Sequence, residues 1–264
     1  MGKDLIHPKE ATDILKEQLE TGLSEYNRTR FSLFLSALTA GLEISFSVFL
    51  MAVVYTLYHG DVSEAAMHTM IAFSYPIGFI LIVIGRSELF TEHTNLALYP
   101  VLGGRKTVGE LAALWGVILG GNLLGGFLIS FFLTWIGPAM EVIDPAAFVH
   151  LAEKMIKFDW PVILGSAILA GWLMGSLSWL LSAAKETASR ITVVVIITAV
   201  IGMGGLHHSI VGFIELVCGV LISPDITIMK VLPVLLLSIL GNIIGGGFFV
   251  AILKYNHVSQ AGAH

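Results

Sequence analysis

The sequence predicts an all-α membrane protein with six transmembrane helices in an inverted repeat of three plus three, in which the second and fifth spans are interrupted. Of its 264 residues, 56% are hydrophobic and only 12% are charged, whereas a soluble domain carries about 25% charge. The apolar residues fall into runs that reach or exceed the roughly 20 residues needed to cross a bilayer. Short motifs also recur about half a chain apart, which indicates a repeat.

The predicted spans follow from the apolar runs. They cover residues 31–57, 66–102, 108–136, 162–184, 191–222 and 231–253. The second and fifth runs are too long for one crossing, and polar or glycine-rich breaks divide them at 85–95 and 202–209. A short helix is expected at 8–28 and a proline-containing loop at 137–160. The chain therefore divides into an N-terminal segment (1–30), a transmembrane channel domain (31–254) and a C-terminal tail (255–264).

The distribution of Lys and Arg sets the predicted orientation. An even number of spans places both termini on the same side, and ten of the 14 basic residues fall on that side. Cytoplasmic loops carry an excess of Lys and Arg. We therefore expect a bacterial-type inner membrane protein with both termini in the cytoplasm.

A repeated motif relates the two halves. Residues 121–126 (GNLLGG) match 241–246 (GNIIGG), and Ala-Gly pairs match at 40–41 and 170–171. Small residues with this spacing let helices approach closely, so Asn122 and Asn242 are expected at equivalent packing positions. Three spans are an odd number, so the second half must enter the membrane from the opposite side. In such folds the substrate path lies at the interface of the halves and is lined by the broken helices.

Ionisable side chains within the spans mark candidate functional positions, since each costs about 2.5–3.5 kcal/mol to insert. They are Glu43, Arg86, Glu88, Glu92, His93, His207, His208 and Glu215. His208 is the strongest candidate, because an imidazole titrates near neutral pH and can donate a proton or hydrogen bond to an anion. Arg86 and Glu88 are expected to pair and hold the first break. Leu89 and Phe90 are candidates for a hydrophobic constriction, beside the hydroxyl of Thr91.

Other chemistry is not indicated. The chain has no phosphate-binding loop, HExxH motif or nucleophile elbow, so it is not expected to be an enzyme or to bind a cofactor. Its single cysteine, Cys218, excludes an intrachain disulfide. No Glu or His pair has metal-ligand spacing on an intact helix, and a net charge of −5 provides no basic surface for nucleic acid.

Three motifs resemble the formate/nitrite transporter family: Leu-Phe-Thr at 89–91, His208-Ser209, and the last-span segment 240–246. The resemblance implies an aquaporin-like protomer in a homopentamer, with a pore in each protomer for a small monovalent anion or its conjugate weak acid. It also implies a central His208 facing Thr91, constrictions at Leu89 and Phe90, and an anion-attracting Lys154 in a vestibule.

The chain departs from the family pattern at several positions. Gly171 stands where the family usually has Asn, and His207 replaces an acidic residue. The carboxylates predicted near the pore are Glu43, Glu88, Glu92 and Glu215. They leave two alternatives open: permeation of cations or metal ions through a Glu/His-lined pore, and a non-transporting membrane scaffold.

Overall fold

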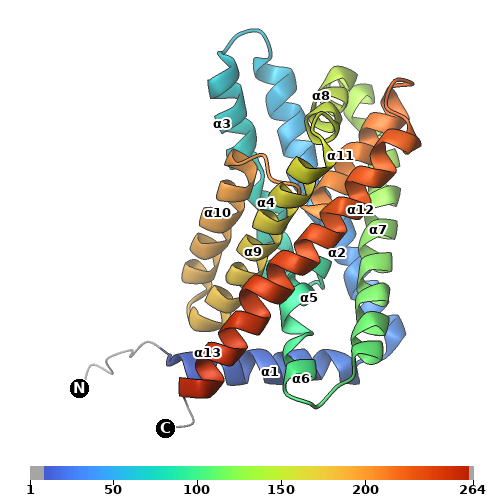
Figure 1. Cartoon of the computed structure of the whole chain (residues 1–264). Coiled ribbons are helices and arrows are strands. Elements are labelled where there is room, and N and C mark those ends of the chain that lie inside the picture. The colour runs from blue at the N-terminus through green and yellow to red at the C-terminus, as the bar shows by residue number, and fades with distance from the viewer. Residues whose placement is uncertain (1–8, 262–264) are drawn as a thin grey trace, which may run out of the picture.

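The computed structural model describes residues 9–261, and every regular element in that range is a helix (Figure 1). Residues 1–8 and 262–264, which belong to the predicted N-terminal segment and C-terminal tail, lie outside the described residues. The elements are α1 (Ala11–Asn27), α2 (Arg30–Tyr58), α3 (Glu64–Ser74), α4 (Pro76–Gly85), α5 (Phe90–Leu96), α6 (Tyr99–Leu102), α7 (Val108–Ala139), α8 (Pro145–Ile156), α9 (Trp160–Ala183), α10 (Thr187–Met203), α11 (Ser209–Ile222), α12 (Ile228–Ile244), the π-helical stretch η1 (Gly245–Ile252) and α13 (Leu253–Ala261).

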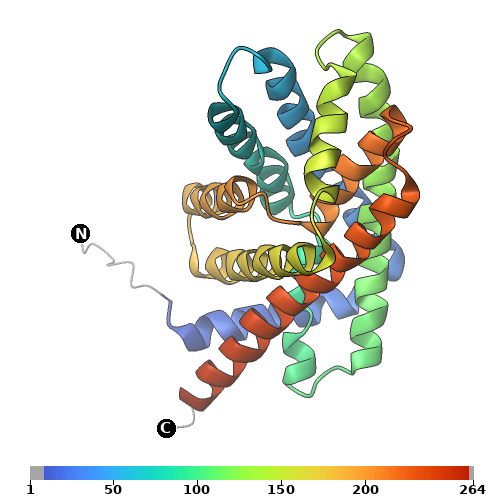
Figure 2. The ribbon, with the colours of Figure 1, turned by 45° about the horizontal axis from the view of Figure 1, so that its top comes forward.

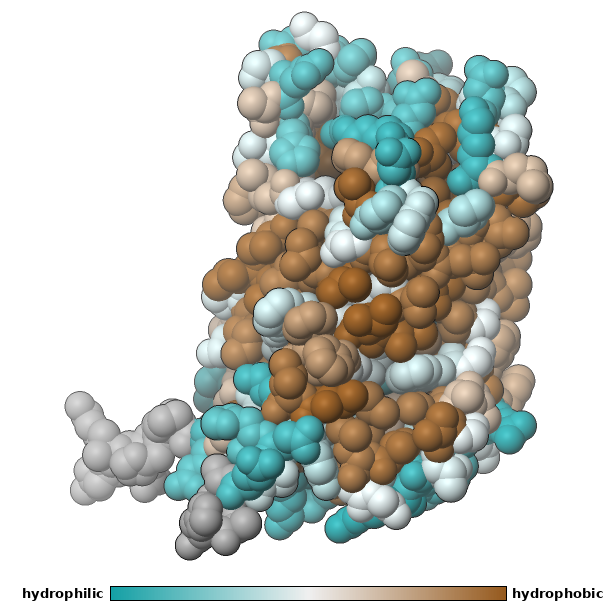
Figure 3. Space-filling model, in the orientation of Figure 1, coloured by the Kyte–Doolittle hydropathy of each residue, from teal (hydrophilic) through white to brown (hydrophobic). Residues whose placement is uncertain are grey.

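Five helical stretches are long and apolar enough to cross a membrane. They are α2, α3–α4 (Glu64–Gly85), α7, α9 and the continuous stretch Ile228–Gln260. The apolar helices α10 and α11 are shorter than these. On the face seen in Figure 3, hydrophobic side chains cover the middle of the molecule and hydrophilic side chains gather at both ends. This distribution is the one expected of a protein surrounded by lipid.

Pro76 interrupts the backbone bonding between α3 and α4, because proline has no N–H to donate. A side chain from α2 satisfies the groups nearby. The hydroxyl of Ser47 donates to the Tyr75 carbonyl (2.6 Å) and accepts from the Gly78 amide (3.0 Å). These contacts hold α4 against α2 and so fix the helix that carries Phe79 into the core.

The two halves share the same close helix contacts. α2 packs along α7, and α9 packs along α12, whose continuation α13 reaches α1 at one end of the molecule (Figure 2). Gly41 lies so close to α7 that a β-carbon there would collide with the backbone of Asn122, and Gly171 meets the backbone of Asn242 in the same way. The matching Ala-Gly pairs in the sequence therefore occupy equivalent places, which supports the predicted repeat.

Two non-helical stretches separate α4 from α5 and α10 from α11. In the first, Arg86 adopts a left-handed conformation with φ of 60°, and in the second Gly205 has φ of 56°. The second stretch agrees with the predicted break at 202–209. The first is shorter than the predicted 85–95, because the chain resumes helical structure at Phe90.

The expected loop at 137–160 contains a helix that the sequence analysis did not predict. α8 begins after Asp144, whose carboxylate accepts a hydrogen bond from the Ala146 amide (2.8 Å). Its buried face packs against α11. At 12 residues, or about 18 Å, the helix is too short to cross a bilayer, so a search for long apolar runs does not detect it.

Candidate functional site

The N-termini of α5 and α11 face one another at the centre of the molecule. Thr91 Oγ1 lies 2.8 Å from His208 Nε2, and both residues are buried. The other ring nitrogen of His208, Nδ1, accepts a hydrogen bond from the Val211 amide (3.3 Å). In the neutral imidazole, Nε2 therefore carries the proton and donates it toward Thr91. The structure thus brings together the two residues predicted to face each other across the breaks.

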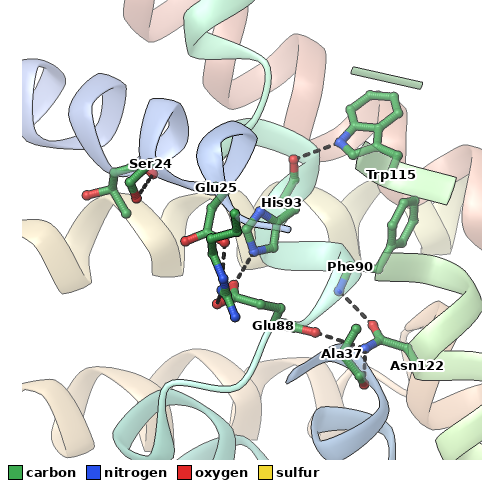
Figure 4. Close-up of polar contacts among 10 residues, drawn as sticks. Ser24, Glu25, Ala37, Glu88, Phe90, His93, Trp115 and Asn122 are labelled. Carbon is green, nitrogen blue, oxygen red and sulfur yellow. Dashed lines mark hydrogen bonds and ion pairs between the residues drawn. The ribbon is translucent and has the colours of Figure 1, made fainter. Parts of the chain in front are cut away.

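Two buried asparagines hold these N-termini in place. Asn122 Oδ1 accepts from the Phe90 amide (2.8 Å), while its Nδ2 donates to the carbonyls of Ala37 (2.7 Å) and Glu88 (2.8 Å), as Figure 4 shows. Each bond joins α7 either to the first break or to α2. The asparagine therefore fixes where α5 begins.

Asn242 makes the equivalent bonds in the second half. Its Oδ1 accepts from the Ser209 amide (2.8 Å), and its Nδ2 donates to the carbonyls of Ala167 (2.8 Å) and His207 (3.0 Å). Both asparagines are 0% exposed. The breaks are therefore held by matching side-chain clamps rather than left as loose loops.

Apolar side chains surround the central hydrogen bond. Phe79 of α4 lies edge-on to the His208 ring, with centroids 5.2 Å apart. Leu89, the residue that precedes α5, is also buried. Phe90 instead meets the Trp115 ring of α7 at 6.2 Å between centroids. Of the two predicted constriction residues, neither lines a described cavity, and Phe79 is the aromatic side chain that contacts His208.

Residues of α3 and α8, which lie at the same end of the molecule (Figure 1), line a cavity of about 790 Å³ that we call the α8 vestibule. Its lining includes Lys154 of α8, Lys157 directly after that helix, two glutamates and three histidines. Burial, followed by the nearby charge of Lys157, lowers the pKa of Lys154, while Glu215 and Glu64 oppose that shift. Lys154, the lysine predicted for a vestibule, lines this cavity.

A smaller space of about 70 Å³, which we call the inner chamber, shares two lining residues, His68 and Lys154, with the α8 vestibule. Its lining also includes His208 and Glu215. One cation, one carboxyl group and the central imidazole thus border the same small space. Such a set can bind an anion and exchange protons with it.

A third cavity, of about 260 Å³, lies at the other end beside α1, and we call it the α1 vestibule. It is lined by several acidic and basic residues, namely Glu17, Glu25, Arg86, Glu88, Glu92 and Arg190. The predicted ion pair between Arg86 and Glu88 is wrong. Glu88 instead binds Arg28 (2.5 Å) and His93 (2.5 Å), as Figure 4 shows for His93. Arg86 caps α4 in a left-handed conformation and its side chain is exposed.

Arg28 joins α1 to the first break, because it also pairs with Glu25 at 2.8 Å. Burial, reinforced by Glu88, raises the pKa of the Glu25 carboxyl, although His93 and Arg28 oppose the shift. Trp115 Nε1 donates to the His93 carbonyl (2.9 Å) from the opposite side. The acidic break is therefore part of a network that extends from the N-terminal helix to α7.

Three further sequence candidates take no part in the central hydrogen bond: Glu43, His207 and the hydroxyl of Ser209. Glu43 accepts from the Ser87 hydroxyl (2.6 Å) and lines none of the described cavities. His207 donates from Nε2 to the Met155 carbonyl (3.0 Å), and its Nδ1 lies 2.9 Å from the Ser166 hydroxyl. The Oγ of Ser209 is buried without a partner among the described residues. His207 and His208 thus have separate surroundings. Within residues 9–261 no group of three or more His, Cys, Asp or Glu side chains is arranged to hold a metal ion.

A sequence profile described as formate/nitrite transporter matches residues 12–256. The chain belongs to the formate/nitrite transporter family. The inner membrane protein YfdC of Escherichia coli is 29% identical to it over 95% of this chain and 80% of that protein. The formate channel FocA of the same organism is 24% identical over 94% of this chain and 93% of its own length. The family resemblance of the sequence motifs is therefore confirmed, and the named relatives are channels and membrane proteins rather than enzymes.

Two solved structures share the fold. One, named an FNT family ion channel, superimposes with a TM-score of 0.84 at 18% identity, and the match covers 93% of this chain and 99% of the other. The second is a pentameric formate channel with formate bound, with a TM-score of 0.76 at 21% identity over 86% of this chain and 97% of that one. Within this family fold, the aromatic Phe79 and the basic residues Arg28 and Arg190 were missed by the sequence analysis. Phe79 lies in a continuous apolar run, where nothing in the sequence distinguishes it from its neighbours.

Proposed function

We propose that this protein is a membrane channel for a small monovalent anion, or for its conjugate weak acid, of the formate and nitrite class. The observation that carries the proposal is the buried hydrogen bond between Thr91 and His208, with the inner chamber on one side and the α1 vestibule on the other. Membership of a family with a named formate channel supports this substrate class.

The proposed architecture is a homopentamer of protomers with six spans each. α10 is 17 residues long and α11 is 14, or about 26 and 21 Å, so each alone is shorter than a hydrocarbon core of about 30 Å. Together they supply one interrupted fifth span, and α3–α4 with α5–α6 supply the second. One of the structural neighbours is a pentameric formate channel, and this likeness supports the assembly. The excess of Lys and Arg supports cytoplasmic termini, and the name of YfdC supports an inner-membrane location.

In the proposed mechanism, Lys154 raises the local concentration of anions at the α8 vestibule. The permeant then loses water as it passes the apolar side chains of Phe79 and Leu89. The Nε2–H of His208 faces Thr91. It supplies a hydrogen bond to the permeant at the point where water is excluded.

One observation favours cation permeation as a second candidate. Four carboxylates but only two arginines line the α1 vestibule, and acidic rings favour cations. Reversal potentials in salt gradients separate the two candidates, because anion and cation conductances shift in opposite directions. The cavities at both ends weigh against a scaffold without a transport role.

The test is uptake of formate, nitrite, acetate and hydrosulfide into proteoliposomes. We expect uptake of at least one of them above empty liposomes, and we expect His208→Ala to lower it at least about tenfold, since positioned proton donors contribute about 10²–10⁴-fold. His257→Ala, at an exposed histidine of α13, is the matched control. The absence of uptake of all four compounds, or a cation-selective conductance, would refute the proposal.

A further inference from the structure

We propose that Glu215 is a proton-carrying residue of the conduction path, which binds the proton that leaves the inner chamber with each anion. The inference rests on the proposed weak-acid channel and adds a residue to it. It concerns the step between the vestibule lysine and the central histidine, for which the family motifs assign no group on this chain.

Glu215 lies between the α8 vestibule and the central histidine. It lies on α11, seven residues after His208, which is about two helical turns or about 10 Å. The side chain is 8% exposed, and it lines the inner chamber together with His208 and Lys154. Any permeant that moves from the α8 vestibule to the central imidazole passes this carboxyl group.

The Glu215 carboxyl group also lacks, within the described part of the chain, the fixed partner that other glutamates near the path have. Among residues 9–261, Glu43 accepts a hydrogen bond from Ser87, and Glu88 pairs with Arg28 and His93. No hydrogen bond or ion pair of these kinds ties down Glu215 within the same residues, although it is the most buried of the three. A buried carboxylate without a partner is costly. The carboxyl group is therefore available to exchange a proton with whatever occupies the chamber.

The net charge of the inner chamber depends on whether Glu215 is protonated. The other ionisable groups lining it are Lys154 from α8, His68 and Tyr75 from α3 and its junction with α4, and His208. His68 is engaged with the Met203 carbonyl at 2.8 Å. With Glu215 ionised, Lys154 is already neutralised, and an entering anion adds an uncompensated charge. With Glu215 protonated, the anion neutralises Lys154, so the anion and the proton occupy the chamber together.

The proton transfer then balances without another reactant. The O–H bond of the Glu215 carboxyl breaks, a new O–H, N–H or S–H bond forms on the anion, and the neutral acid moves past Phe79 and His208. A neutral acid crosses the apolar barrier at far lower cost than the anion. The carboxylate that remains is paired in charge with Lys154 until water in the α8 vestibule returns a proton. The chamber is thus never more than singly charged.

The test measures coupling in proteoliposomes loaded with a pH-sensitive dye, with formate, nitrite, acetate and hydrosulfide each added as the probe. In the wild type we expect an inward proton gradient to accelerate uptake, and a clamped membrane potential to change it by less than about twofold. Glu215→Gln is expected to abolish the acceleration by the proton gradient and to leave a slower flux that changes severalfold with potential. Glu20→Gln, at an exposed carboxylate of α1 that lines none of the described cavities, is the matched control and should behave as the wild type does.

Glu215→Asp guards against a variant that merely misfolds, because it keeps a carboxyl group and should retain the pH dependence at a reduced rate. If the wild type carries an acid and Glu215→Gln keeps the same dependence on pH and potential, the inference about Glu215 is wrong while the channel remains. If the wild type carries none of the four acids, the proposed function fails and the inference fails with it.

Discussion

Asn242→Ala tests whether side-chain clamps hold the breaks in place. Asn242 is 0% exposed and makes three hydrogen bonds. Removal of its amide leaves the Ser209 N–H and the His207 carbonyl without their partner, whereas the Ala167 carbonyl lies within α9 and keeps the helical bond available there. At about 1–3 kcal/mol for each buried unsatisfied group, the loss is about 2–6 kcal/mol. The membrane average of about 0.6 kcal/mol per side-chain hydrogen bond gives about 2 kcal/mol for three.

The assay is thermal denaturation of the purified protein in detergent, monitored by loss of the monodisperse species. A stability loss of about 2 kcal/mol corresponds to a Tm lower by at least about 4 °C. Asn256→Ala is the matched control, since this exposed residue of α13 donates only to the Ile252 carbonyl and should change stability by less than about 0.5 kcal/mol. Asn122→Ala should reproduce the larger effect, because its contacts are equivalent. A Tm for Asn242→Ala equal to that of Asn256→Ala would refute the reasoning.

Two further predictions use the same denaturation assay. Gly171→Ala should destabilise the protein by about 1–3 kcal/mol, because its β-carbon would lie 2.5 Å from Asn242 Cα. Gly165→Ala on the same helix is the control: its β-carbon meets open space, so the change should be neutral or stabilising by up to about 1 kcal/mol. Equal effects of the two substitutions would contradict the close contact at Gly171. Burial, then the charge of Lys154, lowers the pKa of His150 to about 4. The unfolded chain binds the proton first, so stability should fall as pH drops from about 6.5 to about 4, and His150→Gln should flatten that fall. An unchanged slope, alongside a His257→Gln control, would show that His150 does not cause it.

The sequence predicted those features that depend on composition and repetition. The runs that became α2, α7, α9 and α12 are apolar over most of their length, and a bilayer imposes that length directly. The repeated Gly-Asn pairs placed Asn122 and Asn242 correctly because both meet a break through the same three contacts. The motif repetition therefore reflected a repeated hydrogen-bonding requirement.

Features that depend on contacts between distant segments were not predictable. Glu88 was expected to pair with Arg86, two residues away, but the left-handed backbone at Arg86 turns the chain. Arg28, directly after α1, reaches Glu88 instead.

The register between the two breaks was also hidden from the sequence. At the offset of the repeated Gly-Asn motif, Glu88 corresponds to His208. In the structure, Asn122 bonds the amide of Phe90 and Asn242 that of Ser209, so Leu89 corresponds to His208. A single-residue difference between the halves leaves no signal in composition or periodicity.

Gly171, which stands where the family usually has Asn, is explained by helix packing. A family that usually has Asn at this position suggested that the chain had lost a polar group. The backbone of Asn242 lies so close to Gly171 that any side chain there would collide with it. The place therefore accepts glycine for a packing reason that involves no permeant.

Among the described residues, the polar side chains along the path are of two kinds, those with hydrogen bonds to neighbouring protein groups and those without. Backbone groups of neighbouring segments hold the side chains of Asn122, Asn242 and His207 through hydrogen bonds. Such fixed bonds suit residues that keep the path in a constant shape. Lys154 and Glu215 border the inner chamber and have no such fixed partner within residues 9–261, which suits groups whose charges change when an anion enters. Substitution of the first set should therefore lower stability and flux together, whereas substitution of Glu215 should change the dependence of flux on pH and potential in a protein that remains folded. The two kinds of outcome separate the residues that build the path from those that select what passes through it.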